Sequence, residues 1–437
     1  MCGIVGYAGN IETACGKPLE VCLQGLERLE YRGYDSAGVA LTAPGMDKVV
    51  VRKKAGRLKN LVEDIERKPM PLATVGIGHT RWATNGEPSD VNAHPHTSMD
   101  GKVAIIHNGI IENASQLRLD LQAEGYRFAS ATDTEVAAKL LGKIVDKIIA
   151  DEGKPDLFKA VRRMARMLEG AFTILATDCR QPDIVVGARH DSPLVVGLGE
   201  GENFLGSDVA AFVAYTKRAM EVDQDQAVCV SADKVIVTDF DGNVVENPKT
   251  YTVDWDASAA EKGGWDSFMD KEIHEDPAAV QRTLLGRFDA NGGITLDEVR
   301  IDEHDFKAID KIIVVACGTA SYAGQVAKYA IEHWVRIPVE IELAHEFRYR
   351  DPILTPRTLV VAISQSGETM DTLMALRHSR EQGSKVLAIC NTQGASIPRE
   401  SDAVLYTHAG PEVAVASTKA YMVQIAVMYL FAFELAL

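Results

Sequence analysis

Apolar residues in the first 247 positions alternate between short β-type runs and helical spacing. Apolar positions three and four residues apart predict helices over residues 19–29, 134–149 and 157–168. Runs of Val, Ile and Thr bounded by Gly, Asp or Pro predict strands at residues 49–51, 74–78, 103–106, 172–177, 184–188 and 235–237. This mixture predicts a layered α+β domain over residues 2–247.

The pattern changes twice beyond that domain. It weakens over residues 248–301, which we interpret as a linker with a helix near residues 277–285. From residue 302 to 437, strand, polar loop and helix repeat. The strands are expected at 311–316, 358–363, 386–390 and 403–406, and the helices at 322–335, 370–382 and 421–437. Apolar, β-branched strands that alternate with helices predict a doubly wound parallel α/β sheet.

Composition narrows the class of protein. The 437 residues are 46% apolar and 25% charged, which is typical of a globular chain of more than one domain. The net charge of −16 disfavours nucleic acid and anionic membrane surfaces as partners. Seven scattered cysteines, no basic leader and no long apolar run predict a reduced, cytoplasmic chain outside the membrane.

Cys2 is the first candidate for chemistry. It becomes the first residue when Met1 is removed, as is usual before a small side chain. A free α-amino group titrates at about 7.7–8.0, so near neutral pH it can take the thiol proton. The alternative is a small apolar residue that begins a buried strand at residues 4–6. Cys2 alone therefore does not establish a nucleophile.

Two loops supply possible partners for Cys2. Arg81 follows a predicted strand, and its guanidinium suits a carboxylate, with the aromatic Trp82 beside it. Asn108 and Gly109 follow the next strand and offer a side-chain amide and a backbone N–H, the two donors of an oxyanion hole.

Asp133 begins a predicted helix and has two interpretations. It is either an ordinary helix N-cap or an acceptor for a substrate ammonium group. Combined with Arg81, the oxyanion donors and an N-terminal thiol, the second interpretation describes a free amino acid that carries a side-chain amide. Glutamine fits that description.

A polar loop in the second half could hold a phosphate. Ser364, Gln365, Ser366 and Thr369 lie between a predicted strand and a helix, where hydroxyl and backbone N–H groups can bind an anion. An ordinary Ser-rich turn is the alternative. A nucleotide-binding loop of the G-x-x-x-x-G-K-[ST] type is absent from the sequence.

Eight stretches carry a family resemblance. Residues 2–6, 29–38, 79–84 and 107–113 resemble class II glutamine amidotransferases. Residues 316–319, 346–350, 364–369 and 415–419 resemble the first sugar isomerase (SIS) domain of the glutamine:fructose-6-phosphate aminotransferase family, the glucosamine-6-phosphate synthases. The similarity runs over the whole chain.

The resemblance implies a fold and a reaction. The first domain is expected to be a four-layer αββα N-terminal nucleophile glutaminase. The chain is expected to form glucosamine 6-phosphate from L-glutamine and D-fructose 6-phosphate, the first step toward UDP-N-acetylglucosamine. By resemblance, Cys2, Asn108 and Gly109 are catalytic, and Arg81, Trp82, Thr84 and Asp133 bind glutamine. Thr319, Ser364, Gln365, Ser366, Thr369 and Ser417 are expected to bind the sugar phosphate.

The resemblance also implies a homodimer and gives no reason to expect a cofactor. In the family, Trp82 gates an internal passage that carries ammonia to the sugar. We expect no metal, because His94 and His96 have no thiol or carboxylate at ligand spacing.

Three departures from the family pattern are visible. Asn85 stands where many relatives carry His, and Ala320 stands where many carry Ser. The family also has a second SIS domain, which supplies the isomerisation acid and base groups and a Schiff-base lysine. The sequence stops after the first SIS domain, so we expect a fragment; a chain of this length alone is expected to be a glutaminase with a sugar-phosphate-binding module.

Two other functions are possible at this stage. Asparagine synthetases and amidophosphoribosyltransferases share the glutaminase motifs, but the loops that they use for ATP or phosphoribosyl diphosphate are not visible here. The second possible function is a binding module that senses a sugar phosphate. The presence of Cys2 together with its candidate partners Arg81, Asn108, Gly109 and Asp133 argues against it.

Overall fold

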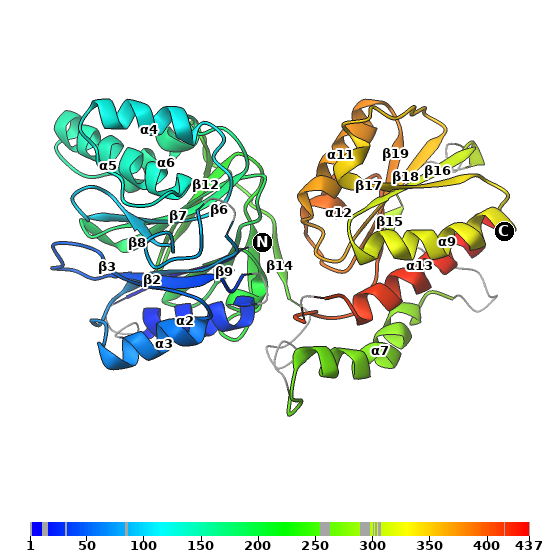
Figure 1. Ribbon diagram of the computed structural model, residues 1–437, viewed down its shortest axis with the longest axis horizontal. Coiled ribbons are helices and arrows are strands. Elements are labelled where there is room, and N and C mark those ends of the chain that lie inside the picture. Colours follow the sequence, from blue (N-terminus) through cyan, green and yellow to red (C-terminus); the bar gives the residue numbers. More distant parts are fainter. Residues whose placement is uncertain are drawn as a thin grey trace. The chain divides into compact units, whose positions relative to one another are not determined.

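The computed structural model describes residues 2–10, 16–30, 33–83, 86–253, 263–288, 298–299, 301, 304, 307–414 and 416–436. The chain divides into two units, Met1–Ala257 and Ser258–Leu437. The expected linker, residues 248–301, is shared between them, since it contains the last strand of the first unit and the first helix of the second (Figure 1).

Two antiparallel sheets form the centre of the first unit. The larger sheet has the strand order β14-β11-β9-β10-β1-β4-β2-β3, and the smaller has β13-β12-β8-β7-β6-β5. The larger contains β1 (Gly3–Gly9), β2 (Ser36–Thr42), β3 (Val50–Ala55), β4 (Val75–Arg81), β9 (Val195–Leu198), β10 (Glu202–Gly206), β11 (Arg218–Glu221) and β14 (Thr250–Thr252). The smaller contains β5 (His96–Thr97), β6 (Val103–Gly109), β7 (Phe172–Asp178), β8 (Gln181–His190), β12 (Gln226–Ser231) and β13 (Val235–Asp239).

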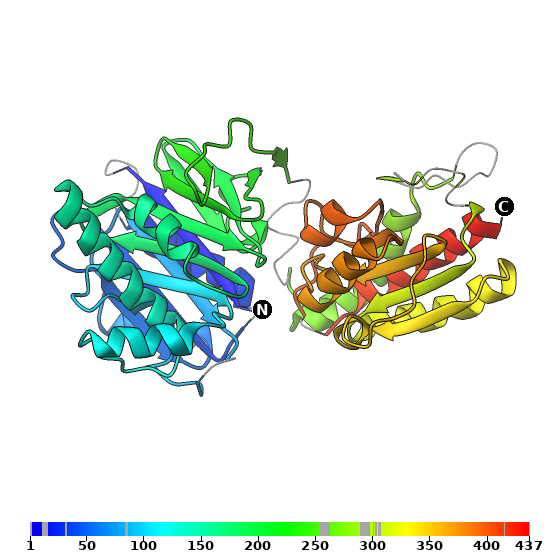
Figure 2. The same ribbon diagram turned by 90° about the horizontal axis from the view of Figure 1, so that it is seen from above.

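Helices cover the outer face of each sheet. The helices α2 (Lys17–Leu29) and α3 (Leu58–Arg67) pack on the larger sheet, and α4 (Ala114–Ala123), α5 (Asp133–Glu152) and α6 (Leu157–Ala165) pack on the smaller one (Figure 2). A 3₁₀ turn, Val209–Ala211, adjoins α2. Between the sheets, Ile4, Ile77, Ile106 and Leu175 belong to one buried apolar cluster. The four layers αββα confirm the predicted fold of the first domain.

The second unit has one sheet in the order β15-β20-β19-β18-β16-β17. Its strands are β15 (Glu298–Val299), β16 (Lys311–Ala316), β17 (Val339–Leu343), β18 (Thr358–Ser364), β19 (Lys385–Cys390) and β20 (Ala403–Tyr406). All neighbours are parallel except β15, which pairs antiparallel with β20. Counted from β16, the parallel strands lie in the order 2-1-3-4-5, which is a doubly wound topology. This confirms the predicted α/β sheet.

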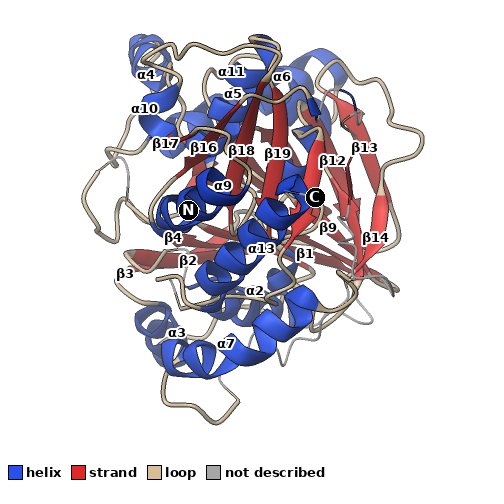
Figure 3. Cartoon of the chain, turned by 90° about the vertical axis from the view of Figure 1, so that its right-hand side faces the viewer, coloured by secondary structure: helices blue, strands red, loops and turns tan. Residues whose placement is uncertain are grey.

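Helices lie on both faces of this sheet. One face is covered by α9 (Thr319–Trp334) and α13 (Lys419–Ala436), which run beside each other, and α7 (Phe268–Leu284) packs against α13 (Figure 3). The other face is covered by α10 (Ala344–Phe347), α11 (Met370–Glu381) and α12 (Ser396–Glu400). The alternate burial of Ile312 and Ile313 in the two apolar clusters explains why β16 reads as a continuous apolar run.

The helix α7 starts earlier than its sequence predicts. It begins at Phe268, after Ser267 has capped it by accepting the Asp270 N–H at 3.1 Å, and Pro277 lies inside it. The expected start at Pro277 is therefore wrong, because the N-cap Ser267, ten residues before the proline, was not recognised.

The helix α13 is long and apolar enough to cross a membrane by length and composition alone. Half of it is buried, and Val427 and Phe431 belong to the apolar cluster beneath the sheet. These contacts are those of a core helix, as its apolar pattern predicts.

Candidate functional site

The thiol of Cys2 lies beside the backbone of Trp82. The strands β1 and β4 pair antiparallel with Gly3 opposite Thr80, so the residue before β1 meets the residues at the end of β4. The Trp82 N–H donates to Cys2 Sγ at 3.2 Å, and the thiol in turn faces the Trp82 carbonyl oxygen at 3.6 Å. The strand register thus fixes the position of the candidate nucleophile.

Burial controls the protonation of this thiol. Removal from water raises the pKa of Cys2 above its ordinary value, although the Trp82 N–H and the Arg81 charge act in the opposite direction. A thiol with a raised pKa is protonated near neutral pH, so its attack on a carbon requires a nearby base. After removal of Met1, the α-amino group of Cys2 is the base closest to the thiol along the chain.

The residues Asn108 and Gly109 end β6 close to Cys2. The Asn108 side-chain amide donates to the Cys2 backbone oxygen at 2.8 Å. Gly109 has φ +120°, and a Cβ atom at this position would lie 2.0 Å from the Ala171 oxygen. Only glycine fits this backbone, because any side chain would clash with the main chain of the neighbouring strand.

The side chain of Arg81 is buried at the end of β4, where Nη2 donates to the Gly86 oxygen at 3.2 Å. Burial lowers the pKa of Arg81, while the charges of Cys2, Asp133 and Asp35 favour its cationic form. A guanidinium ion that is held here by its surroundings is suited to a carboxylate ligand.

The structure corrects one interpretation of Asp133. Thr132 is the N-cap of α5, because its hydroxyl accepts the Glu135 N–H at 3.3 Å, and Asp133 is the first helical residue. The Asp133 carboxylate accepts from the backbone N–H groups of Ile111 and Thr134, each at 2.9 Å. It therefore joins the start of α5 to the segment that follows Gly109.

The ring of Trp82, whose backbone contacts the thiol, is exposed. It is 44% exposed and lies edge-on to Tyr34, with ring centroids 5.5 Å apart. Behind it, the Ala83 N–H donates to the Asp35 carboxylate at 2.9 Å. Two residues of the same loop, Thr84 and Asn85, lie outside the described residues.

The first unit therefore brings together a thiol, two candidate oxyanion donors, a cation and a carboxylate from four separate segments. This set can hold an amino acid by its charged end and attack a side-chain amide. Two neighbours, Asp35 and His79, had no assigned role in the sequence argument. The available signal for His79 was a polar residue directly after the predicted strand 74–78, two positions before Arg81.

The second unit has a polar site where its strand order reverses. In a 2-1-3-4-5 sheet the reversal lies between the first and third strands, here β16 and β18, and ligands bind at the carboxyl ends of these strands. Thr319 begins α9 after β16, and the Ser364–Thr369 loop leads from β18 into α11. Two helix N-termini therefore face this edge, as a phosphate site requires.

Hydrogen bonds within the Ser364–Thr369 loop fix its shape. Ser364 Oγ accepts the Gly367 N–H at 3.0 Å and lies 3.0 Å from the Thr369 hydroxyl. The Ser366 hydroxyl accepts the Glu368 N–H at 3.2 Å. The backbone oxygen of Gln365 accepts from the Asn391 N–H at 3.2 Å, so the loop is also tied to the end of β19. Of the two positions that depart from the family pattern, Ala320 is described, and it packs against the core of the sheet.

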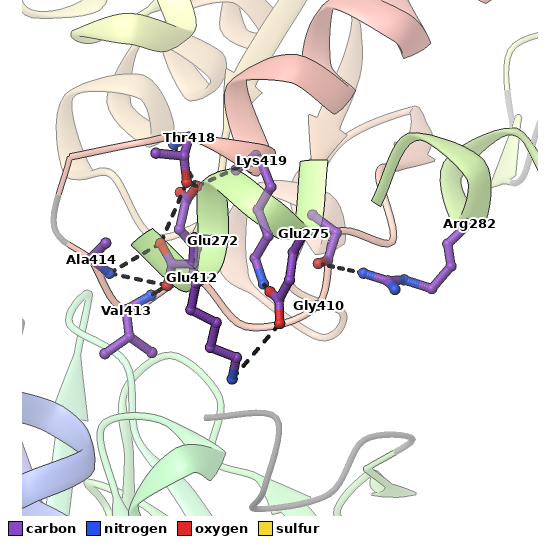
Figure 4. A network of polar contacts seen from close by, with 12 residues as sticks. Glu272, Glu275, Arg282, Gly410, Glu412, Val413, Ala414, Thr418 and Lys419 are labelled. Carbon is purple, nitrogen blue, oxygen red and sulfur yellow. Dashed lines mark hydrogen bonds and ion pairs between the residues drawn. The ribbon is translucent and has the colours of Figure 1, made fainter. Parts of the chain in front are cut away.

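The residue Ser417 lies in a segment held by glutamates. Its hydroxyl donates to Glu412 at 3.1 Å, and Glu412 also accepts the backbone N–H groups of Thr418 and Ala420 (Figure 4). From α7, Glu272 accepts the N–H of Val413 at 2.5 Å and that of Ala414 at 3.2 Å. The segment before α13 is therefore clamped by two carboxylates.

Further contacts join this segment to the Ser364–Thr369 loop. The Asn391 side chain donates to the Gly410 oxygen at 2.8 Å and accepts from Thr407 and from the Ala409 N–H. Lys419, which is buried, donates to Glu275 on α7 (Figure 4). Asn391 thus contacts both the loop after β18 and the segment that leads to Ser417. None of these glutamates was assigned a role from the sequence; Glu272 bonds backbone groups more than 140 residues away, and Glu275 bonds the side chain of Lys419.

Comparison with known proteins finds similarity over the whole chain. The glutamine amidotransferase domain family matches residues 79–214, and the SIS domain family matches residues 306–433. A glutamine-fructose-6-phosphate aminotransferase (isomerizing) of Corynebacterium diphtheriae is 61% identical over 100% of this chain and 69% of its own length. A protein of the same name from Streptomyces coelicolor is 60% identical over 100% of this chain and 68% of its own length.

Among solved structures, one domain is similar to part of this chain. The C-terminal domain of a glucosamine-fructose-6-phosphate aminotransferase from Francisella tularensis is 43% identical, with a TM-score of 0.39, over 40% of this chain and 50% of that one. Both of these relatives, from Corynebacterium diphtheriae and Streptomyces coelicolor, are longer than this chain of 437 residues.

Proposed function

The chain belongs to the glutamine-fructose-6-phosphate aminotransferase (isomerizing) family, and we propose that it takes part in the family's reaction, L-glutamine and D-fructose 6-phosphate giving D-glucosamine 6-phosphate and L-glutamate. The observation that carries the proposal is the contact of Asn108 with Cys2 at the end of two facing sheets. A thiol and an amide donor held together in this way are what hydrolysis of a side-chain amide needs.

In the proposed glutaminase reaction, the Cys2 sulfur attacks the side-chain carbonyl carbon of glutamine. Its proton passes through the α-amino group to the departing nitrogen, so that ammonia leaves and a γ-glutamyl thioester remains. Asn108 and Gly109 hold the oxyanion that forms between these states. Water then hydrolyses the thioester and releases glutamate, which restores the thiol.

Charged groups orient the amino acid for this attack. The buried Arg81 guanidinium binds the α-carboxylate of glutamine, and Asp133 binds its α-ammonium. Trp82 and Thr84 also bind glutamine in this proposal. The contact of the Trp82 backbone with the thiol and the exposure of its ring support this role.

The second unit binds D-fructose 6-phosphate in this proposal. The phosphate lies at the N-terminus of α11 against Ser364, Gln365, Ser366 and Thr369, while Thr319 and Ser417 contact the sugar. The loops after β16 and β18 lie where the strand order reverses. This position supports the assignment, since that edge is where doubly wound sheets hold ligands. We further propose a cytoplasmic homodimer.

Transfer of labelled nitrogen tests the whole reaction. The chain is given glutamine labelled with ¹⁵N in the side-chain amide together with fructose 6-phosphate, and the products are analysed by mass spectrometry. Labelled glucosamine 6-phosphate supports the proposal. Labelled ammonia with glutamate, and no amino sugar, supports a glutaminase joined to a sugar-phosphate-binding module.

A further inference from the structure

The imidazole of His79 is completely buried in β4, directly behind the side chain of Asn108. Its Nε2 atom lies 2.9 Å from Asn108 Oδ1 and 3.0 Å from the His107 backbone oxygen. Oxygen atoms of this kind only accept hydrogen bonds, so Nε2 carries the ring hydrogen and donates it. The ring is therefore held as one tautomer.

This contact selects one of the two orientations of the Asn108 amide. In the observed orientation, Oδ1 faces the His79 N–H and the NH₂ group faces Cys2, where it donates at 2.8 Å. A rotation by 180° would set the NH₂ group against the His79 N–H and the amide oxygen against the Cys2 carbonyl. Both of these contacts are repulsive, so the two hydrogen bonds exclude the rotated form.

The surroundings of His79 keep its ring neutral. Burial, with help from the neighbouring His107 and Arg81, lowers the pKa of His79 to about 3. The ring of His94 stacks on it with centroids 4.3 Å apart. A neutral ring with a fixed N–H donor is an orienting group and not a proton donor to the reaction.

We propose that His79 is a positioning residue that holds the Asn108 amide with its NH₂ group toward Cys2, and so completes the oxyanion hole of the proposed glutaminase. The inference rests on the proposed function. A positioning role differs from a packing role in the core in two ways. Loss of His79 must lower kcat, and this effect must depend on the presence of Asn108.

The test compares variants of the chain with Met1 removed. His79→Leu removes the donor and keeps an apolar side chain of similar size, whereas His79→Gln retains an N–H donor. His94→Gln is the matched control, since His94 packs on His79 within the same cluster. For each variant, kcat and KM for glutamate release are measured together with the rate of Cys2 alkylation by iodoacetamide. Alkylation forms no oxyanion, so it reports the thiol alone.

We expect His79→Leu to lower kcat by on the order of 10-fold to 100-fold, somewhat less than the loss of an oxyanion donor itself. KM and the alkylation rate are expected to stay within about twofold, and His79→Gln is expected to recover part of kcat. In an Asn108→Ala background, His79→Leu is expected to cause no further loss, because residues that act through one another are not additive.

Each opposite result overturns the inference. These are a kcat for His79→Leu within about twofold of the unmodified chain, additive losses in the double variant, or an alkylation rate that falls together with kcat. If His79→Leu does not fold, His79→Asn replaces it, since its shorter amide cannot reach Asn108 Oδ1. An unmodified chain that alkylates at Cys2 but releases no glutamate overturns the proposed function first, and the role of His79 with it.

Discussion

The side-chain amide of Asn108 donates a 2.8 Å hydrogen bond to the backbone oxygen of Cys2, 106 residues earlier in the chain. Cys2 precedes a strand of the larger sheet, and Asn108 ends a strand of the smaller one. The contact therefore exists only when the two sheets pack face to face. In this fold, the apolar layer between the sheets and the candidate oxyanion hole depend on each other.

Loss of the Asn108 amide tests its role as a donor. We expect Asn108→Ala to lower kcat for glutamate release by about 10²-fold to 10³-fold with little change in KM, because the donor acts on charge that develops in the transition state. Asn113→Ala is the control; this side chain bonds backbone groups of residues 167 and 169 instead. Equal kcat values for the two variants, measured by coupled glutamate assay, would remove Asn108 from the site.

The backbone of Gly109 allows a test against a matched glycine. Gly109→Ala places a Cβ atom 2.0 Å from the Ala171 oxygen, whereas Gly125, with φ +92°, has open space at this position. Both substitutions carry the cost of a positive φ, roughly 1 kcal/mol. We expect Gly109→Ala alone to lose most glutaminase activity, in addition to a larger fall in the melting temperature. Similar melting temperatures and activities for both variants would contradict the geometry.

Much of the fold was predictable because local signals agreed with it. The strand β18, the loop after it and α11 follow from an apolar β-branched run, a hydroxyl-rich turn and helical spacing. The alternating strand Val339–Leu343 was missed, since at the edge of the sheet its polar positions resemble a loop. The strand Ser36–Thr42 is fully buried and rich in small residues, so its position became clear only from its pairing with β3 and β4.

The candidate sites were predictable as residue types but not as contacts. A glycine after an asparagine suggested an oxyanion hole, and Arg81 suggested a carboxylate ligand. The donor from His79 to Asn108 and the acceptor Glu272 for the Val413 N–H join elements far apart in sequence. No local pattern encodes such pairs, because they arise only from the packing of one element on another.

Four buried histidines predict a loss of stability in acid. Burial lowers the pKa values of His79, His94, His96 and His107 below the ordinary value near 6.5. In the unfolded chain these groups take up protons below about pH 6.5, while the folded chain does not, so stability falls as pH drops from 6.5 toward 3.

The urea midpoint of the first unit measures this effect. The midpoint is expected to fall between pH 7 and pH 5.5. The free energy of unfolding is expected to decrease over this range by roughly 1 kcal/mol for each such histidine. His94→Gln is expected to flatten the dependence, and His274→Gln, at an exposed position in the second unit, is expected to leave it unchanged. A midpoint that does not vary over this range would show that these rings are not held neutral.

The glutamate clamp in the second unit predicts a defect in sugar binding. Glu272→Ala removes the acceptor for the Val413 and Ala414 N–H groups and releases the segment that leads to Ser417. We expect the affinity for fructose 6-phosphate, measured by calorimetry, to fall by about tenfold, equivalent to about 1.4 kcal/mol. Glu381→Ala, at an exposed position on α11, serves as the control. Unchanged affinity in a natively folded Glu272→Ala variant would separate the clamp from the sugar site.

Glutamate release from glutamine tests the central claim most directly. The chain, with removal of Met1 verified by mass, is assayed with and without fructose 6-phosphate beside a Cys2→Ala variant. The account predicts release by the unmodified chain, no release above background by Cys2→Ala, and a higher rate when the sugar phosphate is present. Equal release by both chains would contradict the assignment of Cys2 as the nucleophile, and the account of the first unit would fail with it.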